Sequence, residues 1–208
     1  MARRYELKAR AERQRETRSR IVDAAIDLHS TIGPARTTIT AVAERAGVQR
    51  HTVYRHFPSE DALFTACITH WDERNPFPDP AAWTGIADPR ERLRHALSEI
   101  YRYYRRVERD LAMFLRDADV VPAVRRSFEE EAATRAHVRE RLAAGWGARG
   151  HRRGLLLAAI GHALEFETWR SLARNHGLDD ERAAELMTRL ASAAASGSGT
   201  GQPATRSP

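Results

Sequence analysis

Apolar residues recur at spacings of three and four along most of this chain, which is the period of an amphipathic helix. Alternating runs of β-branched residues bounded by turns, which would indicate strands, are missing. The sequence therefore predicts an all-α fold. Its 208 residues are enough for one large domain or two small ones.

Nine helices are expected from the apolar stripes, the capping residues and the helix breakers. Gly33-Pro34 ends the first helix, and prolines at positions 76, 78 and 80 exclude a continuous helix between residues 75 and 88. The predicted helices cover about residues 17–31, 39–46, 50–56, 60–74, 89–107, 111–118, 122–142, 152–175 and 179–195.

The same patterns divide the chain into two domains between two disordered ends. Residues 1–15 are basic and have no apolar stripe, which predicts a mobile arm. A small helical domain is expected over residues 16–60 and a larger helical domain over 61–195. Residues 196–208 are rich in Gly, Ser, Thr and Pro and are expected to be disordered.

The excess positive charge lies in the first third of the chain. Residues 1–60 carry 12 Arg and Lys against 7 Asp and Glu, whereas the remainder is nearly neutral. Lys8 is the only lysine, so arginine supplies almost all the positive charge. This distribution is typical of a polyanion-binding module attached to a neutral body, although a solvated basic tail would look the same.

The single cysteine, Cys67, excludes an internal disulfide and favours a reducing cytoplasm. We expect Cys67 to be buried, with a redox-sensing thiol as the alternative. The N-terminus has no apolar segment typical of a signal peptide, and no apolar run reaches the ~18 residues of a membrane span.

The segment Thr37–Phe64 is the most informative part of the sequence. Thr38 is a good N-cap for a short helix with an apolar stripe at Ile39, Val42, Ala43 and Ala46. Gly47 follows at a position that requires a positive φ, and Val48 is the apolar residue beneath that turn. Two helices joined by such a turn form a helix-turn-helix, whose second helix enters the DNA major groove.

In the second helix of this unit, Val53 and Phe57 are expected to face the core. Arg50 can then bind guanine, Gln49 can bind adenine, and the Thr52 methyl group suits a thymine methyl. Tyr54, Arg55 and His56 are expected to contact the DNA backbone. The predicted DNA-binding residues are Thr38, Gln49, Arg50, His51, Thr52, Tyr54, Arg55 and His56.

The N-terminal third, about residues 15–70, closely resembles the DNA-binding unit of the tetracycline-repressor (TetR) family of bacterial regulators. The resemblance is carried by IVDAAIDLHSTIG from Ile21, TTITAVAERAGV from Thr37 and TVYRHFPSEDALF from Thr52. Family members commonly have a phosphate-binding lysine where this chain has Glu60. An acidic side chain there would repel a phosphate, so we do not expect Glu60 to replace the lysine contact. Instead, the backbone amide of Ser59 or Glu60 is expected to bind the phosphate, and the basic arm is expected to supply the missing positive charge.

The resemblance implies that the larger domain dimerises and binds a small molecule. Most aromatic residues in this domain are more typical of an ordinary core, and His162 and Glu165 could instead face solvent or a partner subunit. The candidate ligand-binding residues are Trp71, Tyr101, Tyr104, Phe114, Phe128, His162, Glu165, Phe166 and Trp169.

The last two predicted helices carry more apolar surface than one small domain covers, namely Leu155, Leu156, Ala159, Ala163, Leu164, Ala183, Leu186, Met187 and Leu190. The resemblance implies a homodimer in which two such helix pairs form a four-helix interface. A twofold dimer would place its recognition helices about 34–36 Å apart, which is one turn of DNA.

The sequence therefore predicts a homodimeric transcription regulator in the cytoplasm, most often a repressor in this family, that binds a palindromic double-stranded DNA operator and responds to an effector. A ligand-independent DNA-binding dimer is one alternative, and a helical enzyme or binding protein with an incidental corner motif is another. No recognisable metal-ligand spacing, phosphate-binding loop or dinucleotide fingerprint is present, so no cofactor, metal or enzymatic activity is expected.

Overall fold

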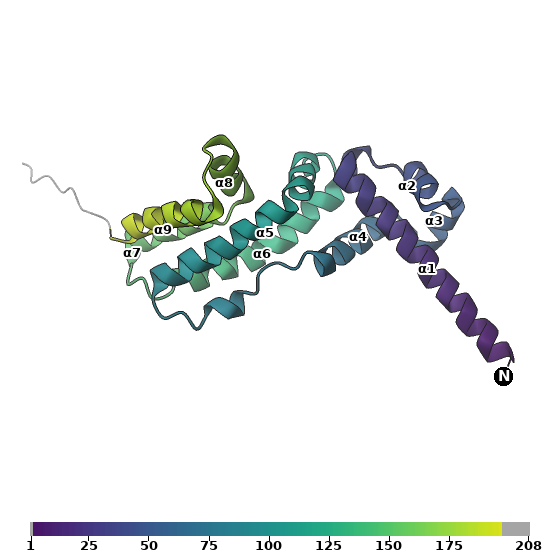
Figure 1. Ribbon diagram of the computed structural model, residues 1–208, viewed down its shortest axis with the longest axis horizontal. Coiled ribbons are helices and arrows are strands. Elements are labelled where there is room, and N and C mark those ends of the chain that lie inside the picture. Colours follow the sequence, from purple (N-terminus) through teal and green to yellow (C-terminus); the bar gives the residue numbers. More distant parts are fainter. Residues whose placement is uncertain (1, 197–208) are drawn as a thin grey trace, which may run out of the picture. The chain divides into compact units, whose positions relative to one another are not determined.

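The computed structural model of the chain describes residues 2–196, with side chains from residue 5 onward (Figure 1). Within this range the secondary structure is helical and contains no strand, which confirms the predicted all-α class. Residues 2–196 contain nine α-helices, namely α1 (Ala2–Thr31), α2 (Ile39–Ala46), α3 (Arg50–His56), α4 (Glu60–Arg74), α5 (Pro89–Asp117), α6 (Pro122–Ala143), α7 (Gly150–Ala163), α8 (Phe166–Arg170) and α9 (Asp180–Ser196).

Short segments of other helix types connect these elements. Pro34–Arg36 (η1) and Pro80–Trp83 (η2) are 3-10 turns, and Ser171–Asn175 (η3) is a π-helical turn that follows α8. Between residues 75 and 88 the only regular structure is η2, as expected from the prolines there. None of the helices in the described range has the length and apolar character needed to cross a membrane.

The chain forms two compact units that do not follow the predicted boundary after residue 60. Unit 1 comprises the residues up to Phe77 together with Val107–Glu131, and unit 2 comprises Pro78–Arg106 and the residues from Ala132 onward. Helices α5 and α6 therefore each contribute to both units. Helix α4 belongs to unit 1 because it packs against α1.

The core of unit 1 is built by one face of each of its first four helices. Ile21 and Ala25 of α1 and Val42 of α2 are completely buried, as is Val53 of α3. Cys67 of α4 lies in the same cluster, where burial raises the pKa of its thiol to about 12. The prediction of a buried cysteine is thus confirmed, and the thiol stays protonated at neutral pH.

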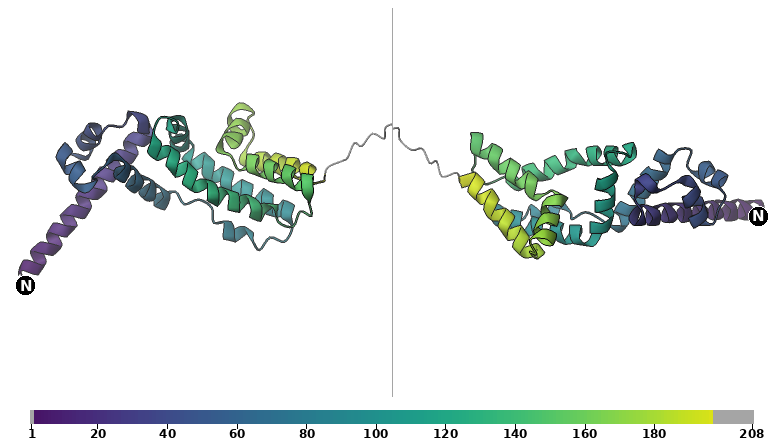
Figure 2. Two further views of the ribbon diagram at one scale, coloured as in Figure 1. Left: turned by 180° about the vertical axis from the view of Figure 1, so that it is seen from behind. Right: turned by 90° about the horizontal axis from the view of Figure 1, so that it is seen from above.

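Unit 2 has a separate core in which α7 packs against α9 (Figure 2). Leu93, Leu97 and Ile100 of α5 are completely buried here, and so is Trp169 of α8. Trp83 of η2 is also buried and donates its indole N–H to Glu99 over 2.5 Å. Most of the aromatic surface of this unit is therefore used for ordinary packing.

The expectation of a disordered basic arm over residues 1–15 is wrong for the described residues, because α1 begins at Ala2 rather than near Thr17. Residues 2–31 contain no Gly or Pro and are rich in Ala, Arg and Glu, which have high helix propensity. Once Ile21 and its neighbours fix the helix against the core, each added residue extends it without a new nucleation cost.

Two predicted helix boundaries in the larger domain are also wrong. The helices expected over 89–107 and 111–118 form the single helix α5, because no breaker separates them. The helix expected over 152–175 is interrupted at Leu164 and Glu165, between α7 and α8. The tail expected over 196–208 lies outside the described residues, apart from Ser196 at the end of α9.

Candidate nucleic-acid interface

Helices α2 and α3 are joined by the tight three-residue turn that the sequence predicts. Gly47 adopts φ 66° and ψ 39°, the left-handed conformation that glycine accepts without steric cost. The amide of Val48 donates to the carbonyl of Ala43 over 3.0 Å, and its side chain packs against the core. At the other end of α2, the Thr38 Oγ1 accepts a hydrogen bond from the Ala41 amide over 3.2 Å.

The two faces of α3 differ as expected. Val53 is completely buried and Phe57, which caps the helix, is 2% exposed, so both anchor α3 on the core. Of the predicted DNA-binding residues on and before α3, five are exposed and two are half-buried. The exposed side chains are Gln49, Arg50, His51, Tyr54 and Arg55, and the half-buried ones are Thr52 and His56.

Neighbouring side chains already organise the exposed face of α3. The Arg50 guanidinium donates to the Tyr54 hydroxyl over 3.3 Å and lies 5.6 Å from the centre of its ring. Burial, followed by the charges of Arg55 and Arg18, lowers the pKa of His56. His56 is therefore neutral near pH 7 and can donate one hydrogen bond, while the arginines supply the positive charge.

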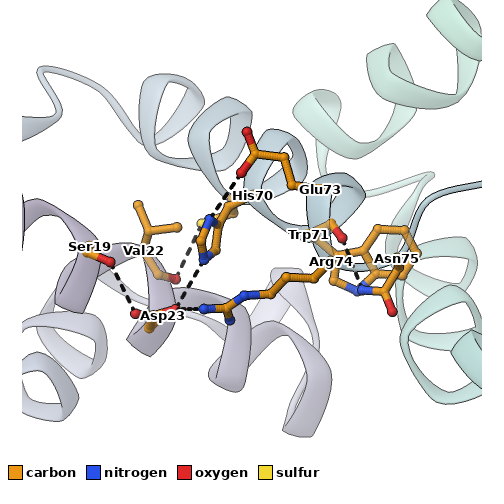
Figure 3. Close-up of polar contacts among 9 residues, drawn as sticks. Ser19, Val22, Asp23, His70, Trp71, Glu73, Arg74 and Asn75 are labelled. Carbon is orange, nitrogen blue, oxygen red and sulfur yellow. Dashed lines mark hydrogen bonds and ion pairs between the residues drawn. The ribbon is translucent and has the colours of Figure 1, made fainter.

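Helix α1 holds each of the other three helices through a charged side chain. Arg18 lies 4.7 Å above the Phe57 ring at the end of α3, and Asp27 forms an ion pair with Arg45 of α2. Asp23 contacts α4, where Arg74 lies 3.0 Å away (Figure 3). These contacts supplement the apolar core and orient α3 relative to α1.

Figure 3 shows the Asp23 contact in more detail. Its carboxylate lies 3.3 Å from the His70 imidazole and accepts a 3.4 Å hydrogen bond from the Ser19 hydroxyl. The other imidazole nitrogen of His70 faces Glu73 at 3.6 Å. The α1–α4 contact is therefore a polar network at the edge of a core, which the sequence alone does not indicate.

The N-terminus of α4 is capped and acidic. The Ser59 hydroxyl accepts a hydrogen bond from the Ala62 amide over 3.1 Å, and Glu60 and Asp61 occupy the first turn. Asp61 pairs with Arg126 of α6 over 2.6 Å. The carboxylate of Glu60 is exposed, in keeping with its favourable position at the positive end of the helix dipole.

A contact that sequence reasoning missed links α5 to the loop that precedes α2. The buried Asp117 carboxylate accepts hydrogen bonds from the Ala35 amide over 2.9 Å and from the Arg116 guanidinium over 2.7 Å. Arg116 in turn donates to the carbonyl of Ile32 over 3.1 Å. These interactions, first among them the hydrogen bond from Arg116, lower the pKa of Asp117.

Three of the nine candidate ligand-binding residues lie in unit 1. Trp71 and Phe114 are buried with their rings edge to face, 6.1 Å between centres, and the Trp71 indole donates to Asp110 over 2.7 Å. Together with the half-buried Phe128 they line a cavity of about 20 Å³ formed by α4, α5 and α6. A second, more polar recess of about 130 Å³ in the same unit is lined by His29, Thr37 and Glu60 among others.

The other six candidates lie in unit 2, where four of them form an aromatic cluster. Tyr104 contacts Phe166 and Trp169, with ring centres 5.5 and 6.0 Å away. The hydroxyls of Tyr101 and Tyr104 donate to the carbonyls of Ala163 and Leu164, at the break between α7 and α8. These tyrosines satisfy backbone acceptors that the break would otherwise leave unpaired.

The remaining two candidates, His162 and Glu165, have exposed side chains. The His162 ring lies 3.2 Å from the Thr168 hydroxyl, and Glu165 is the N-cap residue of α8 without a side-chain capping bond. Helices α7 and α9 also expose apolar side chains, since Leu155 is 45%, Leu186 38% and Leu190 51% exposed.

The helix-turn-helix region matches a known family. Residues 21–67 match the family model described as bacterial regulatory proteins, tetR family. The HTH-type transcriptional repressor KstR of Mycolicibacterium smegmatis is 37% identical over 97 residues, which is 46% of this chain and 47% of that protein. KstR of Rhodococcus jostii is 37% identical over 99 residues, which is 45% of this chain and 43% of that protein. The chain thus spans about half the length of the curated relatives that it matches.

Solved structures resemble the chain over most of its length. A TetR-like transcriptional regulator from Rhodococcus sp. RHA1 has a TM-score of 0.58 at 24% identity, covering 87% of this chain and 96% of that one. The multidrug binding protein EbrR, solved in complex with imidazole, has a TM-score of 0.55 at 26% identity, covering 83% and 93%. The names of these relatives describe regulators and binding proteins, not enzymes.

Proposed function

We propose that the chain is a member of the tetR family of bacterial regulatory proteins and acts as a DNA-binding transcriptional repressor in the cytoplasm that a small molecule releases from its operator. The observation that carries this proposal is the helix-turn-helix itself. Gly47 forms the turn that connects α2 to α3. The buried Val53 anchors α3 on the core, and the polar side chains of α3 face outward. Such a helix fits the major groove of B-DNA.

The side chains near the start of α3 recognise the DNA base sequence. Arg50 binds the O6 and N7 acceptors of a guanine, Gln49 binds an adenine, and the Thr52 methyl group packs on a thymine methyl. His51 is exposed beside them and completes the base-facing set. In the free protein Arg50 is held by Tyr54, so it is partly ordered before DNA binds.

Phosphate contacts position α3 without reading sequence. Arg55 and Tyr54 are exposed on α3, and the neutral His56 donates one hydrogen bond to the DNA backbone. Thr38 is exposed at the start of α2, where its hydroxyl can donate to a phosphate while accepting from Ala41. At the start of α4, the Ser59 and Glu60 amides serve as phosphate ligands in place of a lysine side chain.

The regulator acts as a homodimer through α7 and α9. Leu155, Leu186 and Leu190 are large apolar side chains that these helices leave exposed in the single chain. A second copy would cover them in a twofold interface, which removes apolar surface from water on both subunits. The dimer presents two α3 helices to successive major grooves of a palindromic operator, about 34 Å apart.

The effector site is the cavity of unit 1 that Trp71, Phe114 and Phe128 line. Its aromatic walls suit an apolar, ring-containing ligand, and Asp72 is also among the residues that line it. The cavity now has a volume of about 20 Å³, so a ligand must widen it and move α4 relative to α5 and α6. Since α4 packs on α1, such a movement shifts the helix-turn-helix. EbrR, which is named as a multidrug binding protein, supports a small-molecule effector.

A DNA-binding dimer without an effector is the second candidate. It is favoured by the same cavity volume, which has room for little more than one water molecule. A ligand shifts a conformational equilibrium only if it binds one state more tightly than the other. A filled core that no ligand enters would leave the dimer permanently competent to bind DNA.

The test is binding of the purified chain to the DNA upstream of its own gene, across a salt series and beside random DNA of equal length. We expect tight binding to a preferred site, with an affinity that falls steeply as salt rises. Binding no tighter than to random DNA would contradict an operator at that position. Apolar aromatic compounds are then screened for release of the operator complex, and a Phe128→Glu variant that no longer responds would locate the effector site.

A further inference from the structure

The N-terminal part of α1 extends well beyond the helices that it holds together (Figure 1). Helix α1 contributes to the core of unit 1 from Ile21 onward. Residues 5–20 are exposed except for the half-buried Ala9 and Thr17. This extension therefore makes no apolar core of its own. The side chains of residues 5–20 therefore contact either solvent or a binding partner.

Basic side chains lie on two opposite faces of this extension. Lys8, Ala11, Arg15 and Arg18 follow one another at spacings of three and four, so they form one stripe along the helix. Arg13 and Arg20 lie about 160° around the helix from Arg15 and Arg18, at 100° per residue. Lys8 and Arg15 are both exposed.

Arg18 fixes the direction of this stripe relative to α3. Its guanidinium lies 4.7 Å above the Phe57 ring, at the C-terminal end of α3. It is also close enough to His56 to contribute, with burial and Arg55, to the lowered pKa of that residue. The stripe thus starts beside the phosphate-facing end of α3 and runs away from it along α1.

We propose that Lys8, Arg15 and Arg18 form a second DNA-contacting surface, which binds phosphates of the duplex flanking the half-site of α3. From Lys8 to Arg18 the helix rises about 15 Å, which corresponds to about four base pairs of B-DNA. This surface supplies positive charge that is missing at the start of α4, where the acidic Glu60 occupies the first turn. This inference rests on the DNA binding proposed above.

The experiment compares two full-length double variants that each remove two positive charges. Lys8→Gln with Arg15→Gln removes the stripe, and Arg13→Gln with Arg20→Gln is the matched control on the opposite face. Affinity for operator DNA with long flanks is measured across a salt series. The stripe variant is expected to bind more weakly, with a salt slope smaller by about 0.9 for each phosphate that the protein no longer neutralises, while the control keeps the slope of the unmodified chain.

Trimming the flanks of the operator gives an independent readout. Removing about four base pairs outside each half-site should weaken binding of the unmodified chain and of the control, but not of the stripe variant. Site preference over random DNA should be unchanged, because phosphate contacts do not read sequence. Circular dichroism of both variants checks that α1 stays helical.

Equal salt slopes for the two variants, or no effect of trimming the operator flanks, would overturn the proposal of a second DNA-contacting surface. The same comparison on random duplex DNA separates it from the proposed function. A slope difference there without any operator preference would support the surface and contradict the sequence-specific regulator. Operator preference with equal salt slopes for the two variants would support the sequence-specific regulator and contradict the second DNA-contacting surface.

Discussion

The Asp117 carboxylate accepts a 2.9 Å hydrogen bond from the backbone amide of Ala35, a residue 82 positions earlier in the chain. Ala35 lies in η1, directly between α1 and α2, and Asp117 is the last residue of α5. Arg116 reinforces the contact by donating to both Asp117 and the Ile32 carbonyl. The end of α5 thereby fixes the loop from which the helix-turn-helix begins.

Replacing Asp117 by Ala should lower the free energy of unfolding by about 1–3 kcal/mol, because the Ala35 amide would be left without its acceptor in a partly buried place. Asp117→Asn keeps an oxygen for that amide but removes the charge facing Arg116, so we expect an intermediate loss of stability. Urea unfolding followed by circular dichroism measures both effects. The matched control is Asp119→Ala, two residues away and exposed, which should cost little. Equal losses of stability at positions 117 and 119 would show that the contact contributes nothing.

His29 should make the stability of unit 1 depend on pH. Burial lowers its pKa from 6.5 to about 4, against a smaller opposite effect of Asp117. The unfolded state therefore binds more protons between these values, and stability falls as the pH falls from about 7 towards 4. At about 1.4 kcal/mol per pKa unit, the expected loss of stability between pH 7 and 5 is about 2 kcal/mol.

The measurement compares unfolding at pH 7 and pH 5 for the unmodified chain and for His29→Phe, which keeps an aromatic ring against Phe64. The variant should lose less stability than the unmodified chain over this range. Asp117 loses its own contribution at more acidic pH, because a carboxylate with a depressed pKa stabilises the folded state above its unfolded-state pKa, and this stability is lost as the pH falls from there through the depressed pKa. An identical pH dependence of both proteins would argue that His29 does not titrate on unfolding.

Arg50→Ala should reduce the preference for the operator over random DNA by about tenfold to a hundredfold if Arg50 binds a guanine. The control is Tyr54→Phe, which removes only the hydroxyl to which Arg50 donates and should leave the preference largely intact. Both are measured by competition binding at one fixed salt concentration. A loss of affinity that is equal for operator and random DNA would identify Arg50 as a phosphate ligand instead.

Leu186→Glu combined with Leu190→Glu should convert the proposed dimer into a monomer. Two buried carboxylates on α9 would face their own copies across the twofold axis, which is unfavourable without partners. Sedimentation equilibrium measures the mass, and operator binding should weaken sharply because two linked half-sites are no longer engaged together. Val120→Glu alters an apolar residue that is 69% exposed outside α9 and should stay dimeric. A monomeric unmodified chain would contradict the interface.

The helix-turn-helix could be predicted from the sequence because its determinants are local. A threonine cap at position 38, an apolar stripe and a glycine at position 47 specify α2 and its turn within ten residues. Val53 and Phe57 then leave only one face of α3 for solvent. No distant residue is needed for this assignment, so the predicted bounds of α2, α3 and α4 agree with the structure.

The larger domain could be predicted less well, because tertiary contacts decide where its helices end. Leu164 and Glu165 are not helix breakers, yet α7 stops there and Tyr101 and Tyr104 bind the carbonyls at the break. A hydrogen bond between positions about 60 apart leaves no local signature. The sequence does not distinguish ligand-binding aromatic residues from core ones either, since burial alone does not show which aromatic side chains border a cavity.

The sequence by itself determined the all-α class, the helix-turn-helix and the polar face of α3, since periodicity and capping act between residues a few positions apart. Only the tertiary structure decided that α1 holds its neighbours through Arg18, Asp23 and Asp27 and that Asp117 binds the loop before α2. Those contacts join segments tens of residues apart. They exist because folding brings charged side chains from distant segments to the same edge of a core.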